Sequence, residues 1–205
     1  MSATRRAATL PVSFFTRTAD VVARELLGAL VVSTLDGRRT KGRIVETEAY
    51  LGHDDPASHG YLSRRHARNE ALFGPPATWY VYLSYGMHWC ANLVCGPVGH
   101  ASAVLLRALE PVSGLETMRE RRGGVADRRL SSGPGKLCQA LGIAREYDGL
   151  PLDRPPFRLD ERRKAPEIVT GPRIGITRAT ELSWRYMEAN SPFLSRTAPR
   201  AARRS

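Results

Sequence analysis

The stretch ATWYVYLSYGMHWCANLV, residues 77–94, decides the fold. Its two halves, 77–83 and 88–94, are rich in aromatic and β-branched side chains, and Ser-Tyr-Gly-Met at 84–87 separates them. Two such runs joined by a short loop that contains glycine indicate a β-hairpin. The stretch therefore predicts two neighbouring antiparallel strands in a sheet.

Periodicity on either side of this hairpin predicts further strands and helices. We expect strands over residues 30–35, 41–50, 101–109 and 172–177, and helices over 19–27, 113–122 and 135–141. Thr18 is a candidate cap for the first helix, and Asp36-Gly37 is a hairpin turn signal. Residues 153–166, with three prolines and five basic residues, predict a surface excursion. The predicted fold class is α+β: a single mixed domain with a curved, largely antiparallel β-sheet, flanked by helices, from which the hairpin 77–94 protrudes.

The composition is that of a globular protein with a strong basic excess. The 205 residues include 31 lysines and arginines against 20 acids, which gives a net charge of +11. Only Lys41, Lys136 and Lys164 are lysines, so arginine supplies 28 of the 31 positive charges. No apolar run approaches the roughly 20 residues needed to span a bilayer. The charge predicts a polyanionic partner, because basic residues displace counterions from phosphates.

Both ends of the sequence are basic and poor in apolar residues. We expect a disordered leader over residues 1–12, a single domain over 13–195 and a disordered tail over 196–205. A transit peptide is the alternative interpretation of the leader. Residues 1–10 hold two arginines and 196–205 hold four, without acids, so the core keeps a net charge of +5. With three cysteines and no secretory segment, we expect a reducing, intracellular compartment.

Two groups of side chains are candidates for chemistry. Aromatic residues in strands usually form the core or cross-strand pairs, but Tyr85 lies in the loop beside Gly86, where it suits a wedge between bases. Glu46, Glu48 and Tyr50 alternate along one strand and share a face. They either perform general acid–base chemistry or form the solvated face of the sheet.

A third group is polar and lies between residues 53 and 66. His53, Asp54, Asp55 and His59 could bind a metal, as in a metal-dependent nuclease, but they lack a tight ligand spacing and Asp-Asp-Pro is turn composition. The sequence therefore indicates no metal site. Arg64, Arg65 and Arg68 follow as a basic cluster, which is either a solvated surface or a phosphate contact.

Taken together, these segments resemble a known family. RIVETEAYLG (43–52), DPASH (55–59), YVYLSYGM (80–87), VLLRALEP (104–111) and SGPGKLCQALGI (132–143) resemble the alkyladenine (3-methyladenine) DNA glycosylase family, in its order. The resemblance extends from about residue 14 to about residue 196. It implies a base-excision repair enzyme that flips alkylated purines out of duplex DNA and hydrolyses the N-glycosidic bond with an activated water. The implied substrates are 3-methyladenine and 7-methylguanine, with hypoxanthine and ethenoadenine as further candidates.

The resemblance also implies site residues. Glu48 matches the catalytic base and Arg107 a residue that supports it, whereas Glu46 does not match the catalytic position. The base pocket would comprise Tyr50, His59, Tyr82 and Asn92, with Asn92 excluding the 2-amino group of normal guanine. Tyr85 and Met87 would intercalate, and Arg64, Arg68 and Lys136 would contact the DNA backbone.

The register of the hairpin tests the role of Asn92. A two-residue loop at Tyr85-Gly86 pairs Tyr82 with Trp89 and puts Asn92 on the opposite face from Tyr82. An odd-numbered loop centred on Met87 pairs Tyr82 with Asn92, so that both share a face. The role implied for Asn92 requires a shared face, and we therefore predict the second register.

The shortage of lysine bears on the reaction type. A glycosylase that also cleaves the strand needs an amine nucleophile, so we expect a monofunctional enzyme that uses water, needs no cofactor, and leaves an abasic site. The expected partner is double-stranded DNA with damaged purines, bound by a monomer with no membrane association in the bacterial cytoplasm. The rival from another class is a basic DNA-binding protein that has lost its chemistry, and the carboxylate at Glu48 argues against it.

Overall fold

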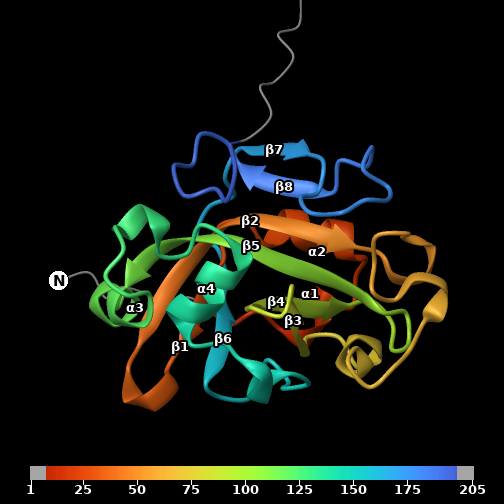
Figure 1. Ribbon diagram of the computed structural model, residues 1–205, viewed down its shortest axis with the longest axis horizontal. Helices are drawn as coiled ribbons and strands as arrows, with labels where there is room; N and C mark the ends of the chain where they lie inside the picture. Colours follow the sequence, from red (N-terminus) through yellow and green to blue (C-terminus); the bar gives the residue numbers. More distant parts are fainter. Residues whose placement is uncertain (1–7, 198–205) are drawn as a thin grey trace, which may run out of the picture.

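A computed structural model describes residues 8–197 (Figure 1). Its helices are α1 (Val12–Phe15), α2 (Ala19–Leu26), α3 (Leu115–Arg121) and α4 (Pro134–Leu141). Its strands are β1 (Leu30–Ser33), β2 (Thr40–Tyr50), β3 (Trp79–Ser84), β4 (His88–Cys95), β5 (Ser102–Ser113), β6 (Phe157–Asp160), β7 (Ile168–Gly171) and β8 (Arg185–Glu188). The α+β prediction is confirmed: eight antiparallel strands form one open sheet, accompanied by short helices.

Strand β2 organises the sheet. The strand order is β3-β4-β5-β2-β1-β6, and β8 also pairs with β2 and carries β7. One edge of β2 pairs with β5, whereas the other edge pairs with β1 in its first part and with β8 at Glu46–Glu48. The ribbon of β7 and β8 therefore lies beside the main sheet at the point where it forks (Figure 1). Register shifts near Ile44 and Glu46 mark bulges, which bend a strand and increase its twist.

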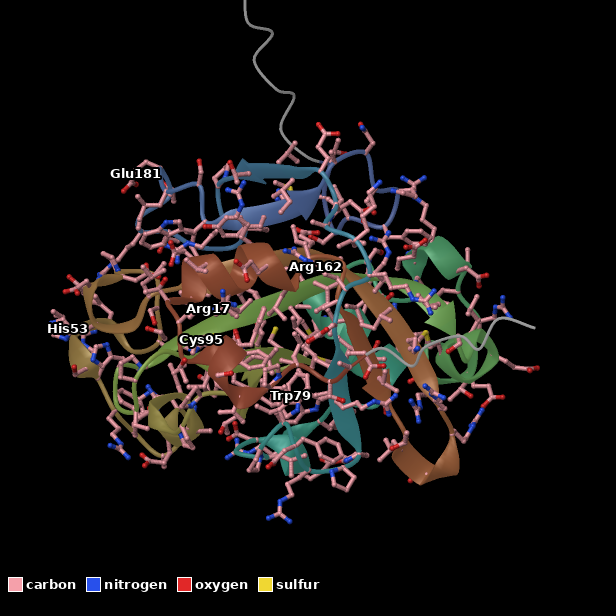
Figure 2. The ribbon with its side chains drawn as sticks, turned by 180° about the vertical axis from the view of Figure 1, so that it is seen from behind. Arg17, His53, Trp79, Cys95, Arg162 and Glu181 are labelled. Atoms are coloured by element: carbon pink, nitrogen blue, oxygen red, sulfur yellow. The ribbon has the colours of Figure 1, made fainter. Side chains whose placement is uncertain are left out.

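The main hydrophobic core joins the helices to the inner strands. In α2 the buried residues Ala19, Val22, Ala23 and Leu26 recur at helical spacing. They share one cluster with Leu137 and Leu141 of α4 and with strand side chains that include Trp79. Figure 2 shows Trp79 and Cys95 inside the molecule, where both are fully buried. The three cysteines are free and buried.

Several sequence predictions need correction. Residues 172–177 form no strand, and the surface excursion at 153–166 contains β6, which pairs with β1. Part of the expected leader is folded, because Leu10 N–H donates to Leu159 O over 2.9 Å and Thr9 bridges Asp160. The edge of β6 provides partners for this segment, a contact that composition does not reveal.

Three further expectations concern the two ends of the chain, membrane-spanning segments and the cap of α2. Residues 1–7 of the leader and 198–205 of the tail are not described. Between residues 8 and 197, no helix has the length and apolarity to cross a membrane. Thr18 occupies the N-cap position of α2, but its side chain makes no capping hydrogen bond.

Helix α4 packs very closely on the hairpin. Pro134 opens this helix and Gly142, at φ +76°, follows its end, as their conformational preferences favour. A Cβ on Gly135 would lie 2.8 Å from the Cβ of His88 in β4. Gly135 therefore allows the contact between the helix and the hairpin strand.

Replacing Gly135 with alanine tests this contact. Helix propensity alone predicts stabilisation by about 1 kcal/mol, but overpacking against His88 predicts destabilisation by about 1–3 kcal/mol. We expect the free energy of unfolding, measured by urea denaturation, to fall. Gln139→Glu, which keeps the acceptor for Arg122 at an exposed position of the same helix, should change it by less than about 0.5 kcal/mol. A more stable Gly135→Ala protein would contradict the close packing.

Candidate active site

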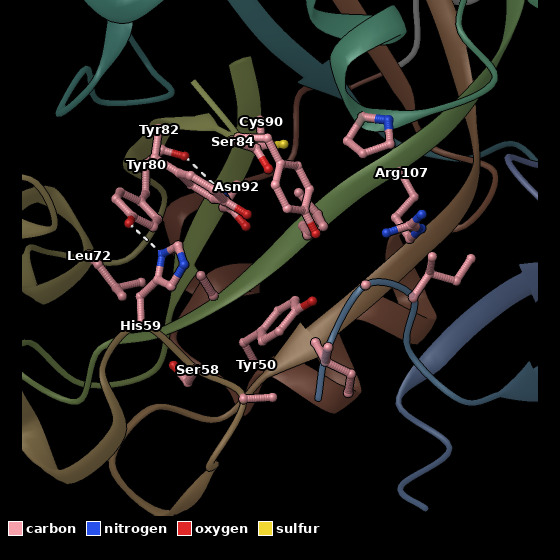
Figure 3. Close-up of a pocket in the computed structure, with 18 of the residues that line it drawn as sticks. Tyr50, Ser58, His59, Leu72, Tyr80, Tyr82, Ser84, Cys90, Asn92 and Arg107 are labelled. Carbon is pink, nitrogen blue, oxygen red and sulfur yellow. Dashed lines mark hydrogen bonds between the residues drawn. The ribbon is translucent and has the colours of Figure 1, made fainter. Parts of the chain in front are cut away.

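A cavity of about 730 Å³ opens where β2, the β3–β4 hairpin and β5 meet. Segments far apart in the sequence line it, including the loop at 56–59 and the irregular stretch at 174–178. Figure 3 shows Tyr50, His59, Tyr82, Asn92 and Arg107 around this space. The cavity thus unites the four predicted pocket residues with Arg107.

Glu48 lies fully buried behind this lining. Its Oε2 accepts hydrogen bonds from Tyr50 Oη over 2.9 Å and Arg107 Nη1 over 3.2 Å, and its Oε1 accepts one from Ile174 N over 2.7 Å. Burial raises the pKa of the Glu48 carboxyl and outweighs Arg107, Ile174 and Tyr50, which lower it. A glutamate with a raised pKa is closer to the neutral range in which a general base is effective.

Tyr50 acts in this group as a hydrogen-bond donor. Burial and the neighbouring Glu48 carboxylate raise the pKa of the Tyr50 hydroxyl well above its ordinary value. The phenol therefore keeps its proton and donates a hydrogen bond to the carboxylate.

Glu46 is the second buried carboxylate of β2 and serves a different set of partners. Its Oε1 accepts from Arg107 Nε over 3.1 Å, Arg185 Nε over 2.7 Å and Ser195 Oγ over 2.8 Å. Its Oε2 accepts from the backbone N–H of Ser195 over 2.6 Å. The alternative in which Glu46 and Glu48 form a solvated sheet face is therefore wrong, because both are completely buried among cationic and N–H donors.

The wall opposite Tyr50 consists of aromatic side chains. Tyr80 and Tyr82 stack with centroids 5.4 Å apart, and the ring of His59 meets Tyr82 edge-on at 4.5 Å. His59 Nδ1 and Tyr80 Oη are 2.8 Å apart and share a hydrogen bond. Burial and the nearby His66 lower the pKa of the His59 imidazole, which favours its neutral form at pH 7.

Neither register considered for the hairpin is correct. The strands pair Tyr80 with Asn92 and Tyr82 with Cys90, around a three-residue loop centred on Gly86. Because the loop is odd-numbered, Asn92 still shares a face with Tyr82, as its implied role requires. Asn92 Nδ2 donates to Tyr80 O over 3.0 Å, which fixes the amide in the cavity wall.

The tip of the hairpin exposes two large apolar side chains. Tyr85 is 82% and Met87 71% exposed. Tyr85 has φ +50° and Gly86 φ +68°, and Met87 N–H donates to Ser84 O, as in a tight turn with left-handed residues. A bulky residue at positive φ is strained, and such strain is concentrated at functional sites.

The three predicted backbone contacts lie at different places around the hairpin. Arg64 and Arg68 are exposed in the loop after β2, and Arg68 lines a second hollow with His66, Trp89 and Arg145. Lys136 is half-buried in α4, where its Nζ donates to Ser132 O over 3.3 Å. Burial and neighbouring arginines lower the pKa of Lys136.

The candidate metal ligands are scattered. His53 is exposed at the periphery (Figure 2), where its ring bonds Ser63, and Asp55 instead forms a buried ion pair with Arg173. Within residues 8–197, no group of three or more His, Cys, Asp or Glu side chains is arranged to hold a metal ion.

Sequence reasoning missed the contribution of residues 173–178. In Arg-Ile-Gly-Ile-Thr, apolar and other residues alternate as in a strand. Arg173, however, donates hydrogen bonds to Asp55, and the Ile174 N–H donates one to Glu48. Ile174 and Ile176 line the cavity, where both are half-buried without a neighbouring strand. An arginine indicates a buried ion pair only when its partner is known. The partner of Arg173, Asp55, lies 118 residues earlier in the sequence.

Comparison with known proteins identifies the family of the chain. The model of the methylpurine-DNA glycosylase family matches residues 13–192. Two relatives are named "Putative 3-methyladenine DNA glycosylase". The one from Nitrosospira multiformis is 54% identical over 85% of this chain and 88% of its own length. The one from Rhizobium meliloti is 53% identical over 92% of this chain and 97% of its own length. A relative from Rhodopseudomonas palustris, 54% identical over 91% of this chain and 88% of its own, bears the same name. The chain belongs to the methylpurine-DNA glycosylase family, whose members are DNA-repair enzymes of base excision.

Proposed function

We propose that the chain flips alkylated purines, above all 3-methyladenine and 7-methylguanine, out of duplex DNA and hydrolyses their N-glycosidic bond with water. One observation carries this proposal: a buried carboxylate, Glu48, lies directly behind an aromatic cavity next to an exposed hairpin tip. A base must leave the duplex before it can enter such a cavity. Hypoxanthine and ethenoadenine are further candidate substrates.

Glu48 is the proposed general base. Its Oε1 accepts one hydrogen bond from the described residues, so a lone pair remains for a water molecule. As the bond between C1′ and the purine nitrogen breaks, the water oxygen bonds to C1′ and its proton passes to Glu48. A cationic lesion takes the bonding electrons and leaves as a neutral purine. The carboxylate also stabilises the positive charge that develops on the sugar.

Arg107 is proposed to support this carboxylate. Its guanidinium bonds Glu46 through Nε and Glu48 through Nη1, so its position is fixed from two sides. Since Arg107 also lines the cavity, it can orient the attacking water.

The aromatic side chains are proposed to recognise the flipped base. Stacking on Tyr50, His59 and Tyr82 contributes on the order of 1–3 kcal/mol per base, and a cationic ring gains further from electron-rich aromatic faces. Asn92, held by Tyr80 O, would collide with the 2-amino group of normal guanine. 7-Methylguanine carries the same group, and it is released because its cationic ring is a better leaving group. These contacts favour alkylated over normal purines.

The hairpin tip and the basic residues are proposed to hold the DNA. Tyr85, with Met87, fills the space that the flipped base leaves, as apolar wedges do in the minor groove. Arg64, Arg68 and Lys136 contact phosphates. None of the three lysines lines the cavity, which supports a monofunctional enzyme without strand cleavage.

Replacing Glu48 with glutamine tests the proposed function. Removal of a general base typically costs 10²–10⁴-fold in rate, so single-turnover release of 3-methyladenine from methylated duplex should fall by about that factor, with DNA affinity retained. Chromatography of the released base measures it. Glu110→Gln, in a half-exposed pair with Arg43, is the matched control and should retain activity. Parental rates from Glu48→Gln would refute the assigned role.

The pH profile tests the electrostatics of Glu48. Because water activation needs the ionised carboxyl, 3-methyladenine release should fall as pH drops through its raised pKa, above the ordinary 4.5. Arg107→Met removes the strongest influence that lowers this pKa, so the acid limb should move to higher pH. Arg185→Met, which removes one of the two ion pairs of Glu46 and no partner of Glu48, should move it less. An acid limb that stays in place or moves to lower pH in Arg107→Met would contradict this.

Replacing Tyr85 with alanine tests the wedge. Since Tyr85 is exposed, the fold should persist, and loss of one stacking contact should slow release from methylated duplex about tenfold or more. Release from methylated single strands should change little, because no vacated position needs filling. Leu62→Ala, exposed outside the hairpin, is the control. An equal loss on both substrates would assign Tyr85 a different role.

A further inference from the structure

A buried ion pair lies directly behind the cavity and takes no part in the proposed reaction. Arg173 Nη1 and Nη2 bind Asp55 Oδ2 and Oδ1 over 2.5 and 2.9 Å, and both side chains are fully buried. Asp55 also accepts the backbone N–H of Leu51 and Ala57, in the loop that leads to the cavity. The pair therefore links the end of β2, this loop and the segment that carries Ile174.

The guanidinium of Arg173 also covers one face of the Tyr50 ring. Its carbon lies 4.7 Å from the centre of Tyr50 and 5.0 Å from that of Trp184, so the cation is held between two rings. Tyr50 lines the cavity, whereas Arg173 does not. The Tyr50 ring therefore separates the guanidinium from whatever occupies the cavity.

This position matters for a charged base. A purine stacked on the free face of Tyr50 would lie roughly 8 Å from the guanidinium. At that separation, in a site from which water is excluded, an unpaired positive charge would disfavour a cationic purine on the order of tenfold or more. Asp55 supplies the compensating negative charge.

The other buried charges near the cavity are balanced in the same way, because the carboxylates of Glu46 and Glu48 face the guanidinium groups of Arg107 and Arg185. The other arginines of the cavity lining, Arg178 and Arg196, are exposed, so solvent screens their charge. Loss of Asp55 alone would leave one excess positive charge behind Tyr50.

We infer that Asp55 and Arg173 set the charge preference of the cavity, with Asp55 neutralising the cation behind Tyr50 so that positively charged purines bind. Both are positioning residues, since they act through Tyr50. Arg173 Nη1 also donates to Ala49 O of β2 over 3.0 Å, whereas its buried Nε has no partner among residues 8–197. An apolar pair of equal volume would often support the fold equally well.

The inference rests on the proposed function and is tested by comparing a cationic with a neutral lesion. The two readouts are the rate of 3-methyladenine release and the affinity for an ethenoadenine duplex relative to undamaged duplex. The charge ratio is the rate of 3-methyladenine release divided by the relative affinity for the ethenoadenine duplex, with both quantities normalised to the parent. The variants are Asp55→Asn, Arg173→Gln and the double variant, each confirmed as folded by circular dichroism.

Charge setting and structural support predict different results. Asp55→Asn should lower the charge ratio about tenfold, Arg173→Gln should leave it unchanged or raise it, and the neutral double variant should return it to within about threefold of the parent. If both single variants lower release and affinity in parallel, or the double variant stays as low as Asp55→Asn, the inference is wrong. A parent protein that releases no 3-methyladenine would instead refute the proposed function.

Should a single variant not fold, the double variant decides. Its two amides retain neutral hydrogen bonding and restore the charge balance, so its ratio should remain within about threefold of the parent. A tenfold lower ratio in the folded double variant would show that charge neutrality behind Tyr50 is not what matters.

Discussion

The structure depends on stabilising the buried carboxylate of Glu48. A buried carboxylate is costly unless cations and hydrogen-bond donors surround it. The donors come from three places: Arg107 from β5, Tyr50 from the same strand and the N–H of Ile174 from a segment more than 120 residues later in the sequence. Bringing them together requires β2 to lie between β5 and β8 at this point. The fork of the sheet thus brings together the groups that stabilise the buried carboxylate.

The same strand positions the aromatic cavity. Beyond Glu48, β2 ends in Tyr50 and passes into the loop that carries His59, while the β3–β4 hairpin brings Tyr82 and Asn92 from one face. The hairpin continues past the cavity to the exposed Tyr85. One continuous pair of strands therefore links the proposed base pocket to the proposed wedge.

The sequence predicted the features that depend on neighbouring residues, above all the strands. The strands at 41–50, 77–83 and 88–94 were predictable because alternation and β-branched or aromatic content act within a few residues. The odd-numbered hairpin loop was predicted from the role that the family resemblance implies for Asn92 and not from local pattern. Its predicted centre, Met87, was wrong, because left-handed Tyr85 and Gly86 centre the loop on Gly86. Partners at long range could not be predicted from composition: Arg173 finds Asp55 and Ser195 finds Glu46. The false strand at 172–177 arose because alternating side chains there serve an ion pair and a cavity.

The most direct test of the account is a single-turnover reaction of the purified protein with a duplex that contains one 7-methylguanine, with and without borohydride. Released base and strand integrity are measured in the same samples. The account predicts release of 7-methylguanine, an intact strand that carries an abasic site, and no covalent adduct, because water activated by Glu48 attacks the sugar. Failure to release the base, or a borohydride-trapped adduct on a lysine, would contradict it.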